Sequence, residues 1–541
     1  MRFFSAANLR PFGFYLLTIV FACLPIWAVD NFVNQDGSPH LYNAYLIVEL
    51  LRGNPAFTEF YALNSAPIPN LTGHYLLALF LLIVTPPVVT KIMVTFTFAG
   101  LAAAVGWLRF QTVGREGLTT AFLIGAALAF NWMWFLGFYN FIIGVIGFAF
   151  TLGLYWRWRE TLDLRRSLIL SALFVVVFFS HLISFAMLVG SVLVIAVTVA
   201  PPNLKRALIW TGAAMLPVLP FVVGYKLRTE AGGAVSPVWR YLENPFSPSN
   251  WFLRLLAADP FQLLTRKGFP FVSETSSLFA VFTPFLWLIV ALSCLAAATL
   301  FYNRRRFFLA RPLLPFVILT GGSILFWVLA PDDFGKAHGS FLRERVLLCG
   351  LICFVPLFRV EKFSRLPKAA ALLLVFIVFF QTLSLWEYAL NADRLAREYL
   401  AGSAQIGGDD QFASAVFIEN GCRYKSNPLS NLNVLYGVGK NTRVWDNYEI
   451  GFYLFPLVVK NHQERQFAFD YREANSFELC DPNEKIADKL NQLNALMDLH
   501  HDKINIILIW NGGEQSLPFL KKWYEDVPVY ENGRTRLFRH R

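Results

Sequence analysis

Residues 14–29 read FYLLTIVFACLPIWAV, and shortly afterwards the chain continues as NQDGSPHLYNAYLIVELLRG at residues 34–53. The first stretch and its flanks are long and apolar enough for one membrane-spanning helix, which needs about 20 residues. No small-x-small cleavage site follows it, and further apolar runs do, so we interpret it as a retained helix. The second stretch places Asp36, His40 and Asn43 where the apolar run ends. An apolar helix followed at once by an ionisable loop is the pattern that decides the fold.

The composition of the whole chain agrees with this pattern. Of 541 residues, 56% are hydrophobic and 15% charged, whereas soluble domains are roughly 45–50% apolar. The net charge of +11 does not form one patch, so no nucleic-acid partner is expected. Basic residues stand in short clusters between apolar runs, as cytoplasmic turns do. These clusters are Arg2 with Arg10, Arg109 with Arg115, 156–167, Lys205 with Arg206, 303–311 and 358–368.

Together, the apolar runs and basic clusters predict a polytopic α-helical protein with about eleven transmembrane helices and a cytoplasmic N-terminus. We expect it in the bacterial inner (plasma) membrane. The expected spans lie near residues 11–29, 88–109, 118–134, 141–157, 167–180, 182–200, 207–225, 278–302, 313–330, 345–358 and 369–387. The apolar stretch 71–87 is short and ends in two prolines, which favours a re-entrant or interfacial helix.

An odd number of spans places the rest of the chain on the outer face, where the composition becomes charged and turn-rich. We therefore divide the chain into a transmembrane module, 1–388, with a long first outer loop at 30–87, and a soluble extracytoplasmic domain, 389–541. A strand pattern at 504–510 and a helix pattern at 484–501 predict that this domain is a small α/β unit. Cys422 and Cys480 are the two cysteines of this domain, and they could form a disulfide.

Ionisable groups of the transmembrane module collect on its outer side. The four histidines His40, His74, His181 and His338 all fall on outer loops or outer helix ends of the expected topology. Such groups at membrane depth are costly, and they usually mark functional sites.

A late outer loop, 330–350, carries Lys336, Arg343 and Arg345 against the positive-inside bias. Two interpretations stay open for these cations. They could meet lipid headgroups or pair with the acids of the same loop. Alternatively, they could clamp a phosphate or pyrophosphate, because arginine forks match phosphate oxygens.

The first outer loop has a readable local structure. Ser38 followed by Pro39 predicts a helix that starts there and runs to Arg52. Asp36 then lies just ahead of the helix N-terminus, where the macrodipole favours its charged form. Such a carboxylate can act as a base or hold a cation, whereas Glu49 is expected to be a solvated surface acid.

Several common site motifs are missing from the sequence. We find no Walker loop, no dinucleotide fingerprint and no Cys/His metal spacing, so ATP-driven transport and a zinc site lack support. No cofactor is certain, although a divalent metal stays open.

In its layout, the chain from residue 1 to about 390 resembles the GT-C superfamily of membrane glycosyltransferases, which use polyprenyl-phosphate-linked sugars. The resemblance implies that Asp36 is the catalytic base, with His40 as its neighbour or alternative. It implies that Arg343 and Arg345 hold the donor phosphate. The second outer loop of the family often supplies a further acid or polar group, and the matching GFYNF segment offers Asn140. The remaining candidate substrate-binding residues are Lys336, His338, His181 and His74.

The function implied is transfer of a hexosyl or pentosyl group, with inversion, to a glycan, lipid or protein acceptor on the extracytoplasmic face. The family's paired-acid motif is absent from the first loop, where NQDGSPHLYNA supplies one acid and a histidine. A transporter or flippase for a lipid-linked or anionic solute is the main alternative, and a non-catalytic envelope assembly factor is the other. No half-to-half repeat is visible, and the acids lie at the membrane edge, which favours the enzyme.

Overall fold

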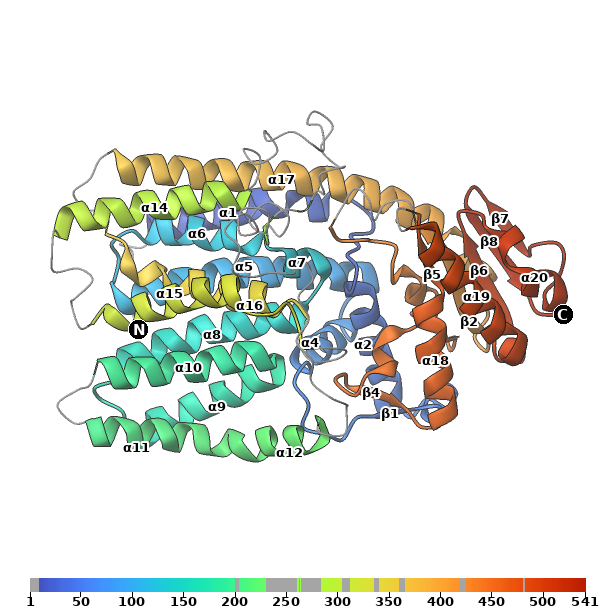
Figure 1. Cartoon of the computed structure of the whole chain (residues 1–541), viewed down its shortest axis with the longest axis horizontal. Coiled ribbons are helices and arrows are strands. Elements are labelled where there is room, and N and C mark those ends of the chain that lie inside the picture. Colours follow the sequence, from blue (N-terminus) through green and yellow to red (C-terminus); the bar gives the residue numbers. More distant parts are fainter. Residues whose placement is uncertain are drawn as a thin grey trace.

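The computed structural model describes residues 9–199, 204–229, 260–261, 263, 284–303, 312–334, 340–359, 365–418, 425–479 and 482–541. A bundle of helices that run side by side forms one part of the molecule, and a smaller sheet with its own helices forms the other (Figure 1). The bundle helices are α1 (Leu9–Trp27), α5 (Pro86–Thr112), α6 (Leu118–Ala129), α7 (Trp132–Leu136), α8 (Tyr139–Trp158), α9 (Leu164–Ser180), α10 (Leu182–Thr198), α11 (Leu204–Met215), α12 (Leu219–Thr229), α14 (Pro284–Asn303), α15 (Leu314–Leu329), α16 (Leu342–Cys353) and α17 (Leu366–Tyr399).

Each segment expected to span the membrane overlaps one or more of these helices. Two of the segments are interrupted: 118–134 divides into α6 and α7, and 207–225 divides into α11, η2 (Leu216–Val218) and α12. Five stretches of the described residues are long and apolar enough to cross a membrane, namely Arg10–Trp27, Pro86–Thr112, Tyr139–Trp158, Leu204–Arg228 and Leu366–Gln405. The chain is therefore an integral membrane protein, while the count of about eleven spans stays a prediction.

The first outer loop folds into α2 (Gly37–Leu51), α3 (Pro55–Thr58), β1 (Tyr61–Leu63) and α4 (Thr72–Leu81). The helix expected from Ser38 begins one residue earlier, and Asp36 occupies the N-cap position without a capping hydrogen bond from its side chain. With 10 residues, α4 is about 15 Å long, half the roughly 30 Å of a bilayer core. Its length therefore suits an interfacial helix.

The expectation for Glu49 was wrong. Only 9% of this residue is exposed, because α2 packs against the C-terminal domain. Its carboxylate accepts hydrogen bonds from Arg52 at 2.7 Å and from Asn54 at 2.8 Å. Glu49 thus forms hydrogen bonds at the C-terminal end of α2 and is largely shielded from water.

The C-terminal domain contains a mixed sheet. Its strands are β2 (Gln411–Ile418), β3 (Arg443–Val444), β5 (Ser476–Glu478), β6 (Ile506–Trp510), β7 (Tyr530–Asn532) and β8 (Thr535–Arg539), in the order β3-β2-β6-β8-β7 with β5 beside β2. Strand β2 is parallel to β3, β5 and β6, and β8 is antiparallel to β6 and β7. Both β2 and β6 are almost wholly buried, as central strands covered on both faces are.

Helices α18 (His462–Ala474), α19 (Asn483–His500) and α20 (Pro518–Trp523) complete this domain. The strand expected at 504–510 and the helix expected at 484–501 are confirmed as β6 and α19. Strand β6 ends in a turn in which Asn511, Gly512 and Gly513 all have positive φ. The expected pair Cys422 and Cys480 lies outside the described residues.

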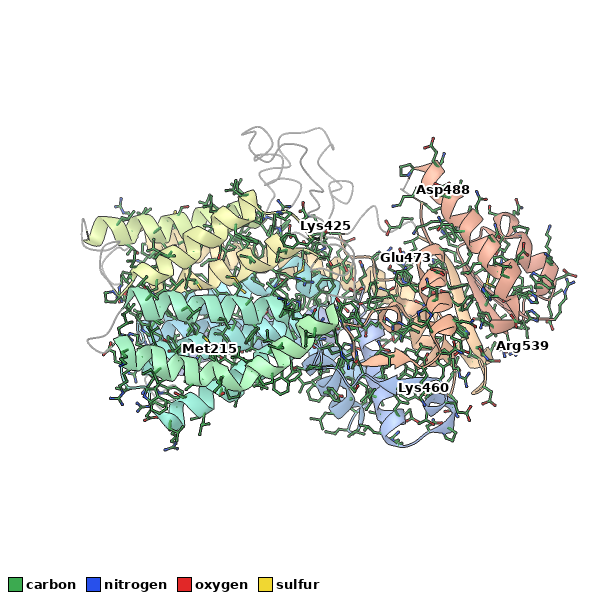
Figure 2. All side chains as sticks on the ribbon, turned by 60° about the horizontal axis from the view of Figure 1, so that its bottom comes forward. Met215, Lys425, Lys460, Glu473, Asp488 and Arg539 are labelled. Carbon is green, nitrogen blue, oxygen red and sulfur yellow. The ribbon has the colours of Figure 1, made fainter. Side chains whose placement is uncertain are left out.

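The C-terminal domain packs directly onto the first outer loop. Strand β4 (Leu457–Val459) pairs antiparallel with β1, in the register Tyr61 to Val459. Tyr42 of α2 donates a hydrogen bond to the Thr442 carbonyl at 3.0 Å. Figure 2 shows charged side chains such as Asp488 on the outer surface of this domain, away from the junction.

The two ends of the helical bundle differ in charge. Arg109 and Arg157 lie in the last turns of α5 and α8, and Arg206 lies near the start of α11. Asn140 lies at the start of α8, and His181 joins α9 to α10. The basic turns are therefore at the end of the bundle opposite the C-terminal domain, the arrangement that the positive-inside rule predicts for a cytoplasmic end.

Candidate active site

A cavity of about 260 Å³ lies where the bundle meets the C-terminal domain. Its walls come from the first outer loop, the outer ends of the bundle helices and the C-terminal domain. The lining residues are Asp36, His40, Asn70, Phe138, Asn140, Phe141, His181, Ser340, Arg345, Tyr448, Phe452, Leu454 and Phe455. Seven polar or charged residues thus share the lining with five Phe and Tyr side chains, and convergent polar groups between aromatic walls are typical of a ligand site.

Asp36 is held at this cavity from two sides. Its backbone N–H donates to the Leu136 carbonyl at 2.8 Å, which ties the loop to α7. Asn431 of the C-terminal domain donates from Nδ2 to Asp36 Oδ1 at 3.0 Å. Burial raises the pKa of Asp36 to about 6, although the positive charges of His40 and Arg472 act in the opposite direction. A pKa near neutrality is what a general base requires.

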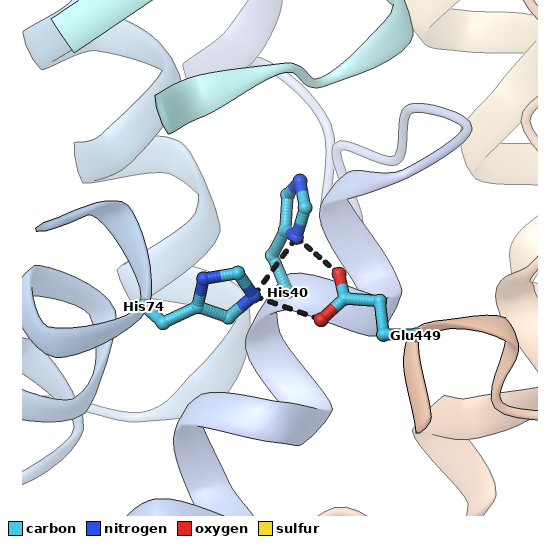
Figure 3. Close-up of side chains that lie close together, drawn as sticks. All are labelled: His40, His74 and Glu449. Atoms are coloured by element: carbon cyan, nitrogen blue, oxygen red, sulfur yellow. Dashed lines mark hydrogen bonds and ion pairs between the residues drawn. The ribbon is translucent and has the colours of Figure 1, made fainter. Parts of the chain in front are cut away.

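Beside Asp36, three buried side chains form a cluster (Figure 3). His40 from α2 and His74 from α4 place Nδ1 and Nε2, respectively, 3.1 Å apart. Glu449 from η10 (Tyr448–Gly451) contacts both rings, with Oε2 at 2.8 Å from His74 Nε2 and Oε1 against His40 Nδ1. The cluster therefore joins the first outer loop to the C-terminal domain.

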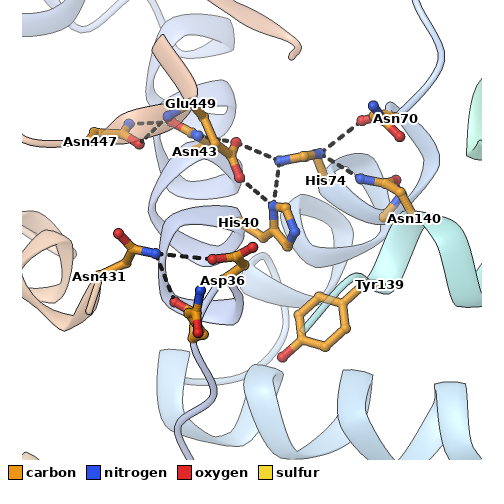
Figure 4. A network of polar contacts seen from close by, with 12 residues as sticks. Asp36, His40, Asn43, Asn70, His74, Tyr139, Asn140, Asn431, Asn447 and Glu449 are labelled. Carbon is orange, nitrogen blue, oxygen red and sulfur yellow. Dashed lines mark hydrogen bonds and ion pairs between the residues drawn. The ribbon is translucent and has the colours of Figure 1, made fainter. Parts of the chain in front are cut away.

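The carboxylate of Glu449 is strongly stabilised. Burial raises the pKa of Glu449, but the charges and hydrogen bonds of His40 and His74 outweigh burial and lower it to about 2. Asn43 also donates to Glu449, and Asn447 donates to Asn43 Oδ1 at 2.7 Å (Figure 4). Glu449 is thus ionised, and its carboxylate contacts His40, His74 and Asn43.

Two asparagines fix the other side of the His74 ring. Nδ1 of His74 lies 3.0 Å from the Asn70 carbonyl oxygen and 3.2 Å from Asn140 Nδ2. Asn140 is itself oriented, because its Oδ1 accepts a hydrogen bond from Gly73 N at 2.6 Å. Asn140, expected in place of a second acid, therefore supports His74 as well as lining the cavity.

The cluster has the composition of a divalent metal site. One ligand atom each from His40, His74 and Glu449 lies within 4.8 Å of the others, and imidazole with carboxylate is a common ligand set for zinc. With protons alone, two N–H groups directed at Glu449 would also face each other across 3.1 Å. A cation removes this conflict, and a partner on the far ring nitrogen is typical of metal-bound histidine. The three residues therefore fit a divalent metal.

Arg345 brings a positive charge to the lining of the cavity. Its Nη1 donates to His181 Nε2 at 2.9 Å. Burial and the charge of Arg345 lower the pKa of His181 well below its ordinary value, so the ring is neutral and can accept this bond. The guanidinium also lies over Phe138 at 5.0 Å and Phe141 at 5.3 Å. Arg345 is thus fixed in place while it faces the cavity.

Arg343 has a different environment. It is fully buried, pairs with Asp332 and lies 3.7 Å from Glu344 Oε1. It is not among the described residues that line the cavity. Of the two interpretations, ion pairing fits Arg343, and phosphate binding fits Arg345. Lys336 and His338 lie outside the described residues.

No protein-family model matches the sequence, and no curated protein matches it. The crystal structure of ArnT from Cupriavidus metallidurans in the apo state does match in three dimensions. The match has a TM-score of 0.53 and 11% sequence identity, and it covers 99% of this chain and 98% of that chain. The chain has the fold of ArnT. The overall layout expected from the sequence, a helical membrane module followed by a smaller C-terminal domain, is thereby confirmed at the level of the fold.

The ArnT-like fold brings together most of the described candidate residues. Asp36, His40, Asn140, His181 and Arg345 line one cavity, and His74 lies directly behind it.

Sequence reasoning missed the contribution of the C-terminal domain, above all Glu449, Tyr448 and Asn431. One signal was present: WDNYEIGFYLF at 445–455 combines two acids and an asparagine with five aromatic rings, an unusual mixture for a surface segment.

Proposed function

We propose that the chain is a membrane glycosyltransferase that moves a sugar from a polyprenyl-phosphate-linked donor to an acceptor on the extracytoplasmic face. The observation that carries this proposal is one cavity bearing both a carboxylate, Asp36, and a guanidinium, Arg345. The ArnT-like fold supports it by providing the same overall architecture. We assign the protein to the bacterial inner membrane, with the N-terminus in the cytoplasm and the C-terminal domain outside.

Asp36 would act as the general base in an inverting displacement. It takes the proton from the acceptor hydroxyl as the hydroxyl oxygen forms its bond to the anomeric carbon. The bond between that carbon and the phosphate oxygen breaks, and its electron pair leaves with the polyprenyl phosphate. With a pKa of about 6, Asp36 is mostly ionised at neutral pH, and it is basic enough to accept the proton.

Arg345 would stabilise the leaving phosphate. Negative charge grows on the bridging oxygen as its bond to the sugar breaks, and a fixed cation in a partly dehydrated site lowers the energy of that state. Arg345 is suited to this because His181 and two phenylalanine rings hold it in place. Arg343 then supports the structure of the same loop.

The second acid of the site would be Glu449, which belongs to the C-terminal domain. His40, His74 and Glu449 would hold a divalent cation, which supplies fixed positive charge next to Asp36 when it is bound. These residues would also connect the C-terminal domain to the first outer loop.

The sugar would occupy the hollow between the aromatic side chains of the bundle and those of the C-terminal domain, such as Phe141 and Phe455.

Release of polyprenyl phosphate tests this function. Purified protein in liposomes is incubated with a panel of polyprenyl-phosphate sugars, and the free lipid phosphate is measured by mass spectrometry. A glycosyltransferase releases it and transfers or hydrolyses the sugar. A transporter or flippase moves the donor between leaflets intact, and a non-catalytic assembly factor does neither. Either of the last two results would overturn the proposal.

A further inference from the structure

The carboxylate of Asp36 is not held by the helix on which it stands. Asp36 occupies the N-cap of α2, yet its side chain makes no capping hydrogen bond. The terminal torsion of aspartate is soft, so an unheld carboxylate can rotate widely. A base that must meet one acceptor hydroxyl therefore needs a partner from elsewhere in the molecule.

Asn431 supplies such a partner. This residue is 2% exposed and stands just before η9 (Leu432–Gly437). Its Nδ2 donates to Asp36 Oδ1 at 3.0 Å and to the Gln35 carbonyl at 3.1 Å. Both amide hydrogens are therefore directed at the segment that carries the base.

The amide of Asn431 can adopt only one orientation here. Its Oδ1 accepts a hydrogen bond at 3.0 Å from Nη2 of Arg472, in the last turn of α18. A guanidinium can only donate and the Gln35 carbonyl can only accept, so the oxygen must face Arg472 and the nitrogen must face Asp36. Arg472 thus locks Asn431 as a donor to the carboxylate.

The segment that carries Asn431 is itself docked on the transmembrane module. Ser426 Oγ donates to the Phe135 carbonyl at 2.9 Å. The backbone N–H of Asn427 donates to Gln35 Oε1 at 3.1 Å. The distance between Asn431 and Asp36 is therefore set by contacts on both sides of the junction.

We propose that Asn431 and Arg472 are positioning residues: through them, the C-terminal domain orients the Asp36 carboxylate towards the acceptor hydroxyl. This inference rests on the proposed function. Neither residue touches the reacting atoms. Their effect is to restrict the carboxylate to the geometry from which it can take the proton. A misplacement of about 1 Å at such a group can cost roughly 100-fold in rate.

The isosteric variant Asn431→Asp tests this role directly. It retains the acceptor that faces Arg472, but it replaces the donor that faces Asp36 with an acceptor. We expect kcat to fall by roughly 10- to 100-fold, with unchanged KM for a polyprenyl-phosphate sugar. Bound metal content should match the wild type, because the residues of the histidine cluster keep their partners. Tm should fall, because the new carboxylate is buried and faces Asp36 and the Gln35 carbonyl. Kinetics are therefore measured well below the Tm of the variant.

The matched control is Asn441→Asp. Asn441 accepts a hydrogen bond from Asn54 at 2.9 Å across the same junction, at the far end of the 15-residue helix α2 from Asp36. This variant should retain the wild-type kcat. An Asn431→Asp enzyme with a kcat within about twofold of wild type, or an equal loss of kcat in both variants, would overturn the positioning role.

Arg472→Gln serves as the second variant, should Asn431→Asp fold poorly. A glutamine amide can donate or accept, so Asn431 would lose the donor that fixes the orientation of its oxygen. Because loss of the Arg472 charge also raises the pKa of Asp36, kcat is compared at about pH 9, where Asp36 is ionised in both proteins. We expect a smaller loss of kcat with the same unchanged KM. If kcat is retained, the proposal fails. A wild-type protein that is inactive in the same assay would instead refute the proposed function, so the two failures are distinguishable.

Discussion

The carboxylate of Glu449 lies 2.8 Å from the imidazole of His74, although 375 positions separate the two residues in the chain. Neither side chain is exposed to solvent. The C-terminal domain therefore contributes directly to the polar cluster behind the cavity, and it is more than an attached recognition module. The polar cluster of the first outer loop is therefore completed by a residue from a distant part of the chain.

We expect the cluster of His40, His74 and Glu449 to bind one divalent metal ion per chain. The purified protein should contain it, as measured by inductively coupled plasma mass spectrometry. Glu449→Gln and His74→Ala should each weaken metal affinity by at least 10-fold, because each removes one ligand of three. Both should also lower Tm, since the bound ion stabilises the folded state by mass action.

Glu49→Gln provides the matched control for these variants. Glu49 is a buried acid of the same loop, but it pairs with Arg52 outside the cluster. Its substitution should leave the metal content unchanged. Wild-type protein that binds no divalent metal, even after exposure to zinc, manganese and magnesium, would contradict the metal site. It would show that protons on the two histidines compensate the charge of Glu449.

Asp36→Asn should increase stability while it removes activity. In the metal-free protein, burial raises the pKa of Asp36 from 3.8 to about 6 on folding, so the folded state binds the proton more tightly than the unfolded state does. The stability due to protonation is present below pH 3.8 and is lost as the pH rises through 6. Asparagine mimics the protonated form, so at pH 7.5 it should stabilise the protein by up to about 3 kcal/mol.

Thermal melts in detergent, with the divalent metal removed by a chelator, check this expectation at two pH values. The Tm of Asp36→Asn should exceed that of the wild type at pH 7.5, and the difference should shrink towards pH 4. A lower Tm than wild type at pH 7.5 would mean that the ionised carboxylate stabilises the fold, contrary to the cost expected from its burial.

The rate should depend on pH through the same carboxylate. A general base must be ionised, so kcat should fall below pH 6 by about tenfold per pH unit. An aspartate with the ordinary pKa of 3.8 would keep the enzyme active to about pH 4. Rates measured between pH 4.5 and 8 separate the two cases, and a flat profile down to pH 4.5 would contradict the raised pKa of Asp36.

The two arginines of the late outer loop should give different defects. Arg345→Gln removes the cation that lines the cavity, so the affinity for the donor phosphate should fall by roughly 10- to 100-fold with little change in Tm. Arg343→Gln removes the buried cation that faces Asp332, which should destabilise the fold by about 3 kcal/mol or more. Donor titrations and thermal melts of both variants test this division, and the reverse pattern would refute it.

Much of the fold could be predicted from the sequence because a membrane imposes strong local constraints. Apolar runs must form helices, since the backbone finds no other hydrogen-bond partners in lipid. Every expected span therefore overlaps at least one helix of the described residues. Strand 504–510 and helix 484–501 were equally visible because their patterns are local. The same local signals identified Asp36, whose position directly after the first apolar run needs no tertiary information.

The remaining parts of the site could not be predicted because they depend on contacts between distant segments. A spacing rule detects metal ligands within one short motif, whereas His40 and His74 are 34 positions apart and Glu449 lies in another domain. Arg343 and Arg345 look equivalent in the sequence. Only the packing of α16 shows that one contacts buried acids and the other lines the cavity.

The donor-lipid assay with wild type and Asp36→Asn tests the central claim most directly. In liposomes that contain the cognate polyprenyl-phosphate sugar, the wild type should release polyprenyl phosphate. Asp36→Asn should do so at least about 100-fold more slowly, because it cannot accept the acceptor proton. Its Tm shows that the variant is folded. Release at the wild-type rate by folded Asp36→Asn would contradict the assignment of this carboxylate as the base.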